Sequence, residues 1–190
     1  MGTSLGINPF TIRRQNVLLD YTMTLSKLNS LSPRDAVTFF RQCCGSVHWA
    51  NAMAEMRPFT DASHLYSTAE EVWAKSSEDD WKEAFTHHPK IGDIKSLRKK
   101  FASTAELASG EQSGVNSASE KTLKALAEGN RLYEAKFGYI FIVCATGKSA
   151  GEMLAILNER LNNIPSREIK IAAGEQAKIT KIRLEKLLTE

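Results

Sequence analysis

The sequence predicts an all-α fold, a single-domain helical bundle, on three observations. At 190 residues the chain has the length of one domain, taking roughly 150 residues per domain. Apolar residues make up 42% of the chain and charged residues 25%, as in ordinary globular domains. From Ser32 onward, helix-start signals and apolar residues three or four positions apart dominate, and only one short segment has the composition of a strand.

The first expected helices have clear starts and stops. Ser32 followed by Pro33 is a typical helix start, and an apolar face then runs to Cys44. A second helix over 47–56 is expected to end before Pro58, because proline disfavours helical backbone in the residue that precedes it.

Capping residues mark the next two helices. Asp61 and Thr68 are both suited to cap a helix, and Thr68 is followed by Glu71 at the spacing of a capping box. Ser77 opens a further helix, which has acidic residues in its first turn and Trp81 on the face that we expect to be buried. This helical pattern then breaks in a loop rich in His, Pro and Gly.

A long helix is expected in the second half of the chain. Residues 95–107 and a Gly/Ser-rich stretch through Ser117 precede it. Its inner face is marked by residues from Leu123 to Phe137 at spacings of 3, 4, 3 and 4, and Gly138 is expected to end it.

The last third of the chain contains one apolar segment and two more expected helices. Residues 139–145 are rich in strand-forming types, but no second segment could pair with them. Because a lone strand leaves its backbone unsatisfied, we expect buried chain that is either extended or helical. Ser149 begins a capping box that opens a helix to about Asn162, and Ser166 is expected to cap a last helix to about Leu188.

Charge, cysteine content and apolar runs exclude several classes of protein. A net charge of +3 is too balanced for a general nucleic-acid binder or a membrane-surface protein. The longest strongly apolar run, 137–145, is about half the length of a membrane span. No secretory signal is recognisable, and three cysteines without a C-x-x-C pair fit a reducing compartment, so we expect a cytoplasmic protein. Residues 1–22 lack periodicity and are interpreted as a leader, tag or flexible arm, which leaves 23–190 as the helical domain.

The most unusual segment runs from His87 to Asp93. Pro89 fixes the backbone beside His88, and Gly92 permits an unusual turn. Such a loop can aim an imidazole for proton transfer, although a helix-ending turn with an exposed histidine explains the same residues. Adjacent histidine side chains point apart, and no Cys/His cluster completes a set of four ligands, so we expect no metal site.

Two other sets of polar residues are candidates for a binding site. Glu111 and Gln112 lie in a segment of small residues, which is either a solvated loop or the lining of a pocket. On the last helix, Gln176 and Arg183 share one face with apolar residues. Because a buried guanidinium requires an anionic partner, Arg183 forms an internal salt bridge, extends to solvent, or binds a ligand carboxylate.

The remaining conspicuous residues have structural interpretations. The basic cluster Arg98–Lys100 is expected to be a solvated helix face rather than a nucleic-acid contact. The adjacent Cys43 and Cys44 and the three tryptophans are expected to fill the core.

A set of short motifs occurs in order from about Leu28 to the end of the chain. They are Arg57–Phe59, His88–Asp93, Glu111–Gly114, Asn130–Ile142, Gly147–Ser149, Glu159–Asn163 and Lys178–Leu184. Read together, they resemble the OHCU decarboxylase family of purine catabolism, in which OHCU is 2-oxo-4-hydroxy-4-carboxy-5-ureidoimidazoline. The resemblance implies an all-α lyase that needs no cofactor or metal and is usually a homodimer. It further implies that a small molecule, OHCU, is decarboxylated to (S)-allantoin in urate degradation, with no nucleic-acid or membrane partner.

The resemblance also assigns residues. It implies catalytic roles for His88, Glu111 and Arg183. The implied substrate-binding positions are Pro89, Ala108, Gln112, Phe141, Ile142, Val143, Cys144 and Ala145. Many family members carry serine at the place of Ala108, so a side-chain hydrogen bond is either missing here or supplied by Ser109.

The implied chemistry needs no electron sink beyond the substrate, because the ring C=N can accept the electrons released with CO₂.

Two other classes of function remain open. A non-catalytic all-α module that binds a small anionic ligand would need Arg183 but would tolerate loss of His88. A helical protein associated with nucleic acid would use Arg98–Lys100, and its affinity would fall steeply with salt.

Overall fold

The computed structural model describes residues 23–88 and 112–188, with side chains described from residue 120 onward in the second range. Every regular element in these ranges is an α-helix, apart from an isolated bridge between Met23 and Leu188. The predicted all-α class is therefore confirmed. Residues 1–22, the expected segment 95–107 and the basic cluster Arg98–Lys100 lie outside the described residues.

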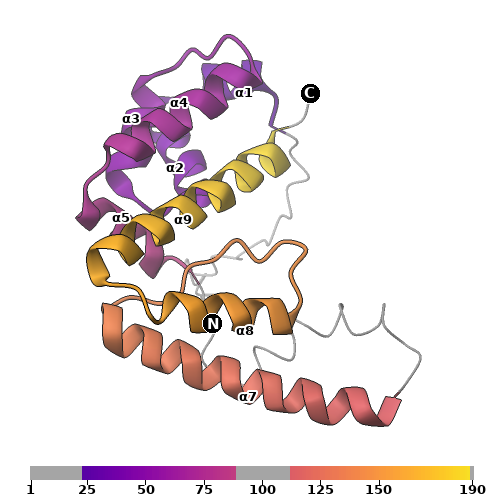
Figure 1. Cartoon of the computed structure of the whole chain (residues 1–190). Helices are drawn as coiled ribbons and strands as arrows, with labels where there is room; N and C mark the ends of the chain where they lie inside the picture. The colour runs from indigo at the N-terminus through magenta and orange to yellow at the C-terminus, as the bar shows by residue number, and fades with distance from the viewer. Residues whose placement is uncertain (1–22, 89–111, 189–190) are drawn as a thin grey trace, which may run out of the picture.

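The first helices form the upper part of the molecule in Figure 1. They are α1 (Leu25–Ser30), α2 (Pro33–Cys43), α3 (Val47–Glu55), α4 (Ala62–Lys75) and α5 (Glu78–Thr86). Each begins after a residue whose side chain accepts a hydrogen bond from the first turn, as predicted at Ser32, Asp61 and Ser77. The expected cap at Thr68 is wrong, because Thr68 lies inside α4 and its hydroxyl donates to the carbonyl of His64 at 2.7 Å.

The second range contains α7 (Gln112–Phe137), α8 (Ala150–Arg160) and α9 (Pro165–Leu187). Helix α7 begins earlier than expected, since residues 112–117 of the predicted Gly/Ser-rich loop are helical. Gly138 ends α7 with a φ of +77°, a conformation that favours glycine.

The starts of α8 and α9 differ in how well the sequence predicts them. The capping box at Ser149 is present, with both of its hydrogen bonds to Glu152. The expected cap at Ser166 is wrong, because Ile164 is the capping residue and Pro165 occupies the first helical position. Proline is well placed there, since it lacks an N–H that would be unpaired anyway and its φ suits a helix.

The hydrophobic core has two large parts and a small cluster that joins them. One large part lies among α1–α4 and the adjoining face of α9. The other lies among α7, α8 and the apolar segment between them. The joining cluster contains Phe85 from α5, Ile142 from the apolar segment, and Ile169 and Ala172 from α9. Helix α9 therefore runs between the upper helices and the α7–α8 pair (Figure 1).

Trp49, Trp73 and the adjacent cysteines lie in the core as predicted, whereas Trp81 is half-buried and packs against its edge. Trp49 and Trp73 are buried, and their indole N–H groups donate to the carbonyls of Ala69 at 3.1 Å and Ala173 at 2.8 Å. Cys43 and Cys44 are buried free thiols.

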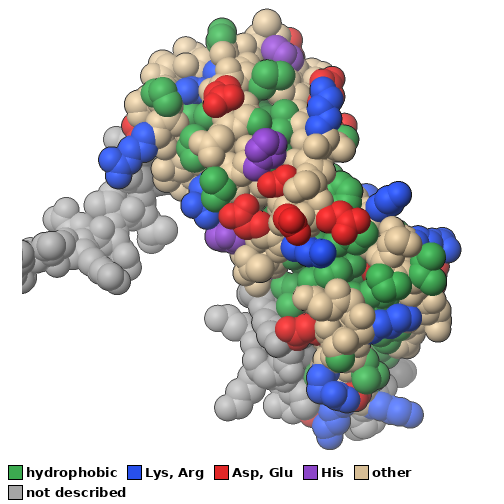
Figure 2. Space-filling view, turned by 90° about the vertical axis from the view of Figure 1, so that its left-hand side faces the viewer, with side chains coloured by type: hydrophobic (Ala, Val, Ile, Leu, Met, Phe, Trp, Pro, Cys, Tyr) green, Lys and Arg blue, Asp and Glu red, His purple; other side chains and the backbone are tan. Residues whose placement is uncertain are grey.

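No helix among the described residues combines the length and apolar character that a bilayer crossing requires. Figure 2 shows acidic side chains gathered at the middle of one face and basic ones toward its lower end. Neither charge forms a continuous surface on that face.

Candidate active site

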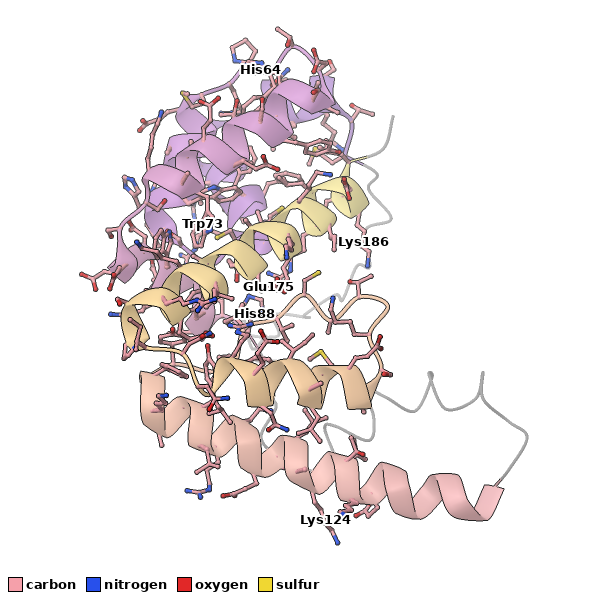
Figure 3. The ribbon with its side chains drawn as sticks, viewed as in Figure 1. His64, Trp73, His88, Lys124, Glu175 and Lys186 are labelled. Carbon is pink, nitrogen blue, oxygen red and sulfur yellow. The ribbon has the colours of Figure 1, made fainter. Side chains whose placement is uncertain are left out.

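The side chains of the two histidines at the end of α5 point in different directions. His87 is the capping residue of α5, and the N–H of His88 donates to the carbonyl of the buried Phe85 at 3.2 Å. The ring of His87 lies against Gly45, where an added Cβ would come within 2.4–2.5 Å of two ring carbons. The ring of His88 turns the other way, toward α9 (Figure 3). The predicted divergence of the two side chains is therefore confirmed.

Helix α9 presents a polar row to this histidine. Gln176 is fully buried, and its Oε1 lies 2.5 Å from Nε2 of His88. The amide nitrogen of Gln176 donates to the hydroxyl of Thr180 at 3.1 Å, one helical turn further on. The buried position of Gln176 on the inner face of α9 agrees with the sequence pattern, whereas Thr180 carried no signal that singled it out.

Arg183 lies on the same helix, about 10 Å further along its axis than Gln176 at 1.5 Å per residue. Its side chain is half-buried, and Nη1 donates to the carbonyl of Cys43 at 3.1 Å. No acidic residue in the described part of the chain lies within ion-pair distance of it. A guanidinium has five N–H donors in a planar fork, so one hydrogen bond leaves capacity for an anionic group.

The thiols near this row are protonated at neutral pH. Burial raises the pKa of Cys44 to about 11, against smaller lowering effects of hydrogen bonds from the Ser46 backbone and the Thr180 hydroxyl. Burial likewise raises the pKa of Cys43 to about 12. Because the thiolate is the nucleophilic form, these residues are structural, as the sequence indicated.

The segment 139–145 is neither helical nor paired in a sheet, so the helical alternative is excluded and the extended one stands; residues 141–144 are buried and the others half-buried. Side chains of three other residues form hydrogen bonds with its backbone. Arg160 Nη1 donates to the carbonyl of Ile142 at 2.8 Å, and the N–H of Cys144 donates to Glu175 Oε2 at 2.7 Å. Lys148 Nζ donates to the carbonyl of Cys144 at 2.7 Å. These contacts replace the ladder that a sheet would provide.

Arg160 is itself fixed by a buried polar network that sequence reasoning did not identify. It is 5% exposed, and its Nε and Nη2 contact Oε1 of the fully buried Glu168 at 2.7 and 2.6 Å. Glu168 also accepts hydrogen bonds from the hydroxyl of Tyr133 and from Asn163 Nδ2, the latter at 2.7 Å. Burial, followed by the hydrogen bond to Glu168, raises the pKa of Tyr133. The network ties α7, α8 and α9 to the extended segment.

Three backbone N–H groups of the extended segment have no hydrogen-bond partner among the described residues. The N–H groups of Phe141, Ile142 and Val143 donate to no described residue, although all three residues are buried. A backbone N–H group in such a place can bind the carbonyl oxygen of a ligand. The N–H of Cys144 is already engaged by Glu175.

Several predicted site residues lie outside the described residues. These are Pro89, Ala108 and Glu111, and of Gln112 only the backbone, as the first residue of α7, is described. Among the described residues, no group of three or more His, Cys, Asp or Glu side chains could hold a metal ion. The structure thus places His88 against Gln176 of α9, while Arg183 lies two turns further along the same face of that helix and contacts the Cys43 carbonyl.

The fold and the site define an all-α domain in which a histidine from the end of α5 meets a buried polar face of the last helix. Comparison with known families gives a match to the model described as OHCU decarboxylase over residues 29–185. The chain belongs to the OHCU decarboxylase family.

Individual relatives agree with this assignment. The Arabidopsis thaliana protein named uric acid degradation bifunctional protein TTL is 40% identical over 154 residues, which cover 80% of this chain and 47% of that protein. The chain thus spans about half the length of that relative. The 2-oxo-4-hydroxy-4-carboxy-5-ureidoimidazoline decarboxylase of Haloferax volcanii is 24% identical over 165 residues, covering 86% of this chain and 95% of that protein.

A solved structure is also similar to this chain. It is a crystal structure of OHCU decarboxylase in the presence of (S)-allantoin, with 38% sequence identity and a TM-score of 0.63. The similarity covers 80% of this chain and 97% of that chain.

Proposed function

We propose that this chain decarboxylates OHCU to (S)-allantoin in urate degradation and that it does so without a cofactor. The observation that carries the proposal is the similarity to an OHCU decarboxylase structure over 97% of that chain, at 38% identity. The placement of His88 beside α9 supports it, and so do the backbone N–H groups of 141–143, which have no partner among the described residues, because they supply an acid–base group and carbonyl-binding groups.

The chemistry of the substrate sets the demands on the site. The bond between the carboxylate carbon and the hydroxyl-bearing ring carbon breaks, CO₂ leaves, and the electron pair passes into the adjacent C=N. Transfer of the hydroxyl proton to the ring nitrogen that received the electron pair turns that carbon into a carbonyl. A proton delivered to one face of the neighbouring ureido-bearing carbon sets the configuration of the product. The ring therefore accepts the electrons, and the protein supplies orientation, charge placement and one proton.

Three side chains and one backbone segment take these roles. His88 gives and takes the proton, since a positioned imidazole is effective near neutral pH. Arg183 anchors the anionic or carbonyl end of the substrate with its planar fork. The N–H groups of 141–143 bind ring or ureido carbonyls. Glu111, which the family resemblance assigns to the site, orients the substrate hydroxyl or His88.

A coupled assay tests this proposal. Urate, urate oxidase and the hydrolase that opens its product generate OHCU in place, and circular dichroism follows the appearance of optically active allantoin. We expect the purified protein to accelerate the formation of the (S) enantiomer, and dialysis against a strong chelator to leave the rate unchanged. Racemic allantoin at the uncatalysed rate would contradict the proposal.

We also propose that the chain acts as a cytoplasmic homodimer, with 23–190 as the catalytic domain and 1–22 as a leader, tag or flexible arm. Three buried free cysteines are in keeping with a reducing compartment. Light scattering coupled to size-exclusion chromatography measures the oligomeric state, and a mass of one protomer at micromolar concentration would contradict the dimer.

A further inference from the structure

We propose that Gln176 is a positioning residue for His88, in that its amide fixes the plane of the imidazole and keeps a proton on Nε2. The inference rests on the proposed function only for the catalytic consequence. The tautomer itself is a property of the protein and can be measured without substrate.

The geometry around Gln176 leaves its amide little freedom. The side chain is fully buried, so each of its polar groups requires a partner within the protein. Oε1 lies 2.5 Å from His88 Nε2, and the amide nitrogen donates to Thr180 Oγ1 at 3.1 Å. A primary amide has a single oxygen acceptor and one NH₂ donor group. With the donor directed at Thr180, the acceptor faces the ring.

Thr180 extends this chain of contacts to a second part of the fold. Its hydroxyl hydrogen-bonds the sulfur of Cys44, which lies between α2 and α3. Gln176 and Thr180 are four residues apart and so occupy the same face of α9. Helix α9 packs against α2, α4 and α5. The carbonyl oxygen that meets His88 is therefore held by a packed helix rather than by a loop.

The consequence for His88 follows from the chemistry of the imidazole. An amide oxygen accepts hydrogen bonds and cannot donate one, so the ring nitrogen that faces it carries a hydrogen. The neutral ring then has its proton on Nε2 and its lone pair on Nδ1, which makes Nδ1 the basic nitrogen of the ring. Carboxylates fix histidine tautomers in the same way in other sites. An amide does so without placing a negative charge beside a site for an anionic substrate.

The test compares four variants with the wild-type protein. Gln176→Leu removes the acceptor at similar volume, and Gln42→Leu applies the same change to an exposed glutamine on α2. Thr180→Val removes the hydroxyl, whereas Thr180→Ser retains it. Nitrogen NMR of histidine-labelled protein reports which ring nitrogen is protonated, and the His88 signals are assigned by their loss in His88→Ala. Steady-state kinetics separate kcat from KM.

We expect the wild-type protein to show the Nε2–H tautomer and Gln176→Leu to show a mixture of tautomers. In Gln176→Leu, kcat should fall about 10–100-fold, the usual effect of removing an orienting partner, while KM changes less than about threefold. Thr180→Val should weaken the preference of His88 for the Nε2–H tautomer, whereas Thr180→Ser should retain the wild-type preference. Gln42→Leu should match the wild-type protein in both measurements.

Either of two results would overturn the inference. One is an Nδ1–H tautomer in the wild-type protein, which is decisive even if Gln176→Leu fails to fold. The other is an unchanged tautomer in folded Gln176→Leu with kcat within twofold of the wild-type value. Absence of OHCU turnover in the wild-type protein would reject the proposed function instead, and the tautomer measurement would still decide the inference.

Discussion

Replacing Glu168 with glutamine should be among the most destabilising isosteric changes in this protein. Glu168 is fully buried, and its Oε1 lies 2.6 Å from Nη2 of Arg160, which is 5% exposed. The substitution leaves a buried guanidinium without its counter-charge. It also sets an NH₂ group against the amide donor of Asn163, which now donates to Glu168 Oε2 at 2.7 Å.

The expected loss can be estimated from the partners that remain. Breaking a buried ion pair by removing one charge costs about 3–5 kcal/mol. Arg160 retains the Ile142 carbonyl and the Tyr133 hydroxyl as partners, so we expect the lower end of this range. A loss of about 3 kcal/mol lowers the ratio of folded to unfolded protein roughly a hundredfold, a large part of the stability of a typical domain.

Urea unfolding followed by tryptophan fluorescence measures this loss directly. Glu128→Gln is the matched control, because Glu128 pairs with Arg131 on the exposed face of α7 and should leave the urea midpoint unchanged. Combining Glu168→Leu with Arg160→Met should cost less than the sum of the single changes, since the double variant buries no unpaired charge. A loss below about 1 kcal/mol in Glu168→Gln would refute the reasoning that this ion pair holds the extended segment.

Three further predictions concern the surroundings of the site. Arg183→Lys keeps the charge but loses the planar fork, so KM for OHCU should rise about tenfold or more in the coupled assay. An unchanged KM would contradict a substrate-binding role for Arg183. Gly45→Ala should cost about 1–3 kcal/mol in urea unfolding, because a Cβ would lie 2.4–2.5 Å from carbons of the His87 ring, and adding His87→Ala should recover most of the loss if the clash is the cause. Glu175 has a lowered pKa: burial raises it, but hydrogen bonds from Lys178 and the Cys144 N–H outweigh burial. The stabilising effect of the ionised Glu175 is thus present above its ordinary pKa of 4.5 and is lost as the pH falls through the lowered value. In Glu175→Gln, the free energy of unfolding should therefore fall less steeply with pH below about pH 4.5 than in the wild-type protein. An equally steep fall would contradict this.

Much of the fold could be predicted from local signals. The starts of α2, α5 and α8 follow from serine caps, and the end of α7 follows from Gly138, because these signals act within a few residues. The start of α9 was predicted two residues late, since a serine cap and a proline at the first helical position compete as signals in Pro165–Ser166.

The site could be predicted in part. His88 and Gln176 each carried a local signal, namely a proline-fixed loop and a polar residue on an apolar helix face. Their contact joins positions 88 residues apart, and no spacing rule connects such positions. The same holds for Arg160 and Glu168, whose role depends on the path of the extended segment between α7 and α8. Only the fold shows which polar residues meet.

The most direct test of the central claim compares His88→Ala with His87→Ala in the coupled assay. The ring of His88 reaches the buried face of α9, whereas that of His87 lies on the turn at Gly45. We expect His88→Ala to retain the wild-type circular dichroism spectrum and to lower the rate of (S)-allantoin formation by about 10²–10⁴, the usual contribution of a positioned acid or base. His87→Ala should stay within a few-fold of wild type. Equal rates in the two folded variants would contradict the assignment of His88 as the proton-transfer group.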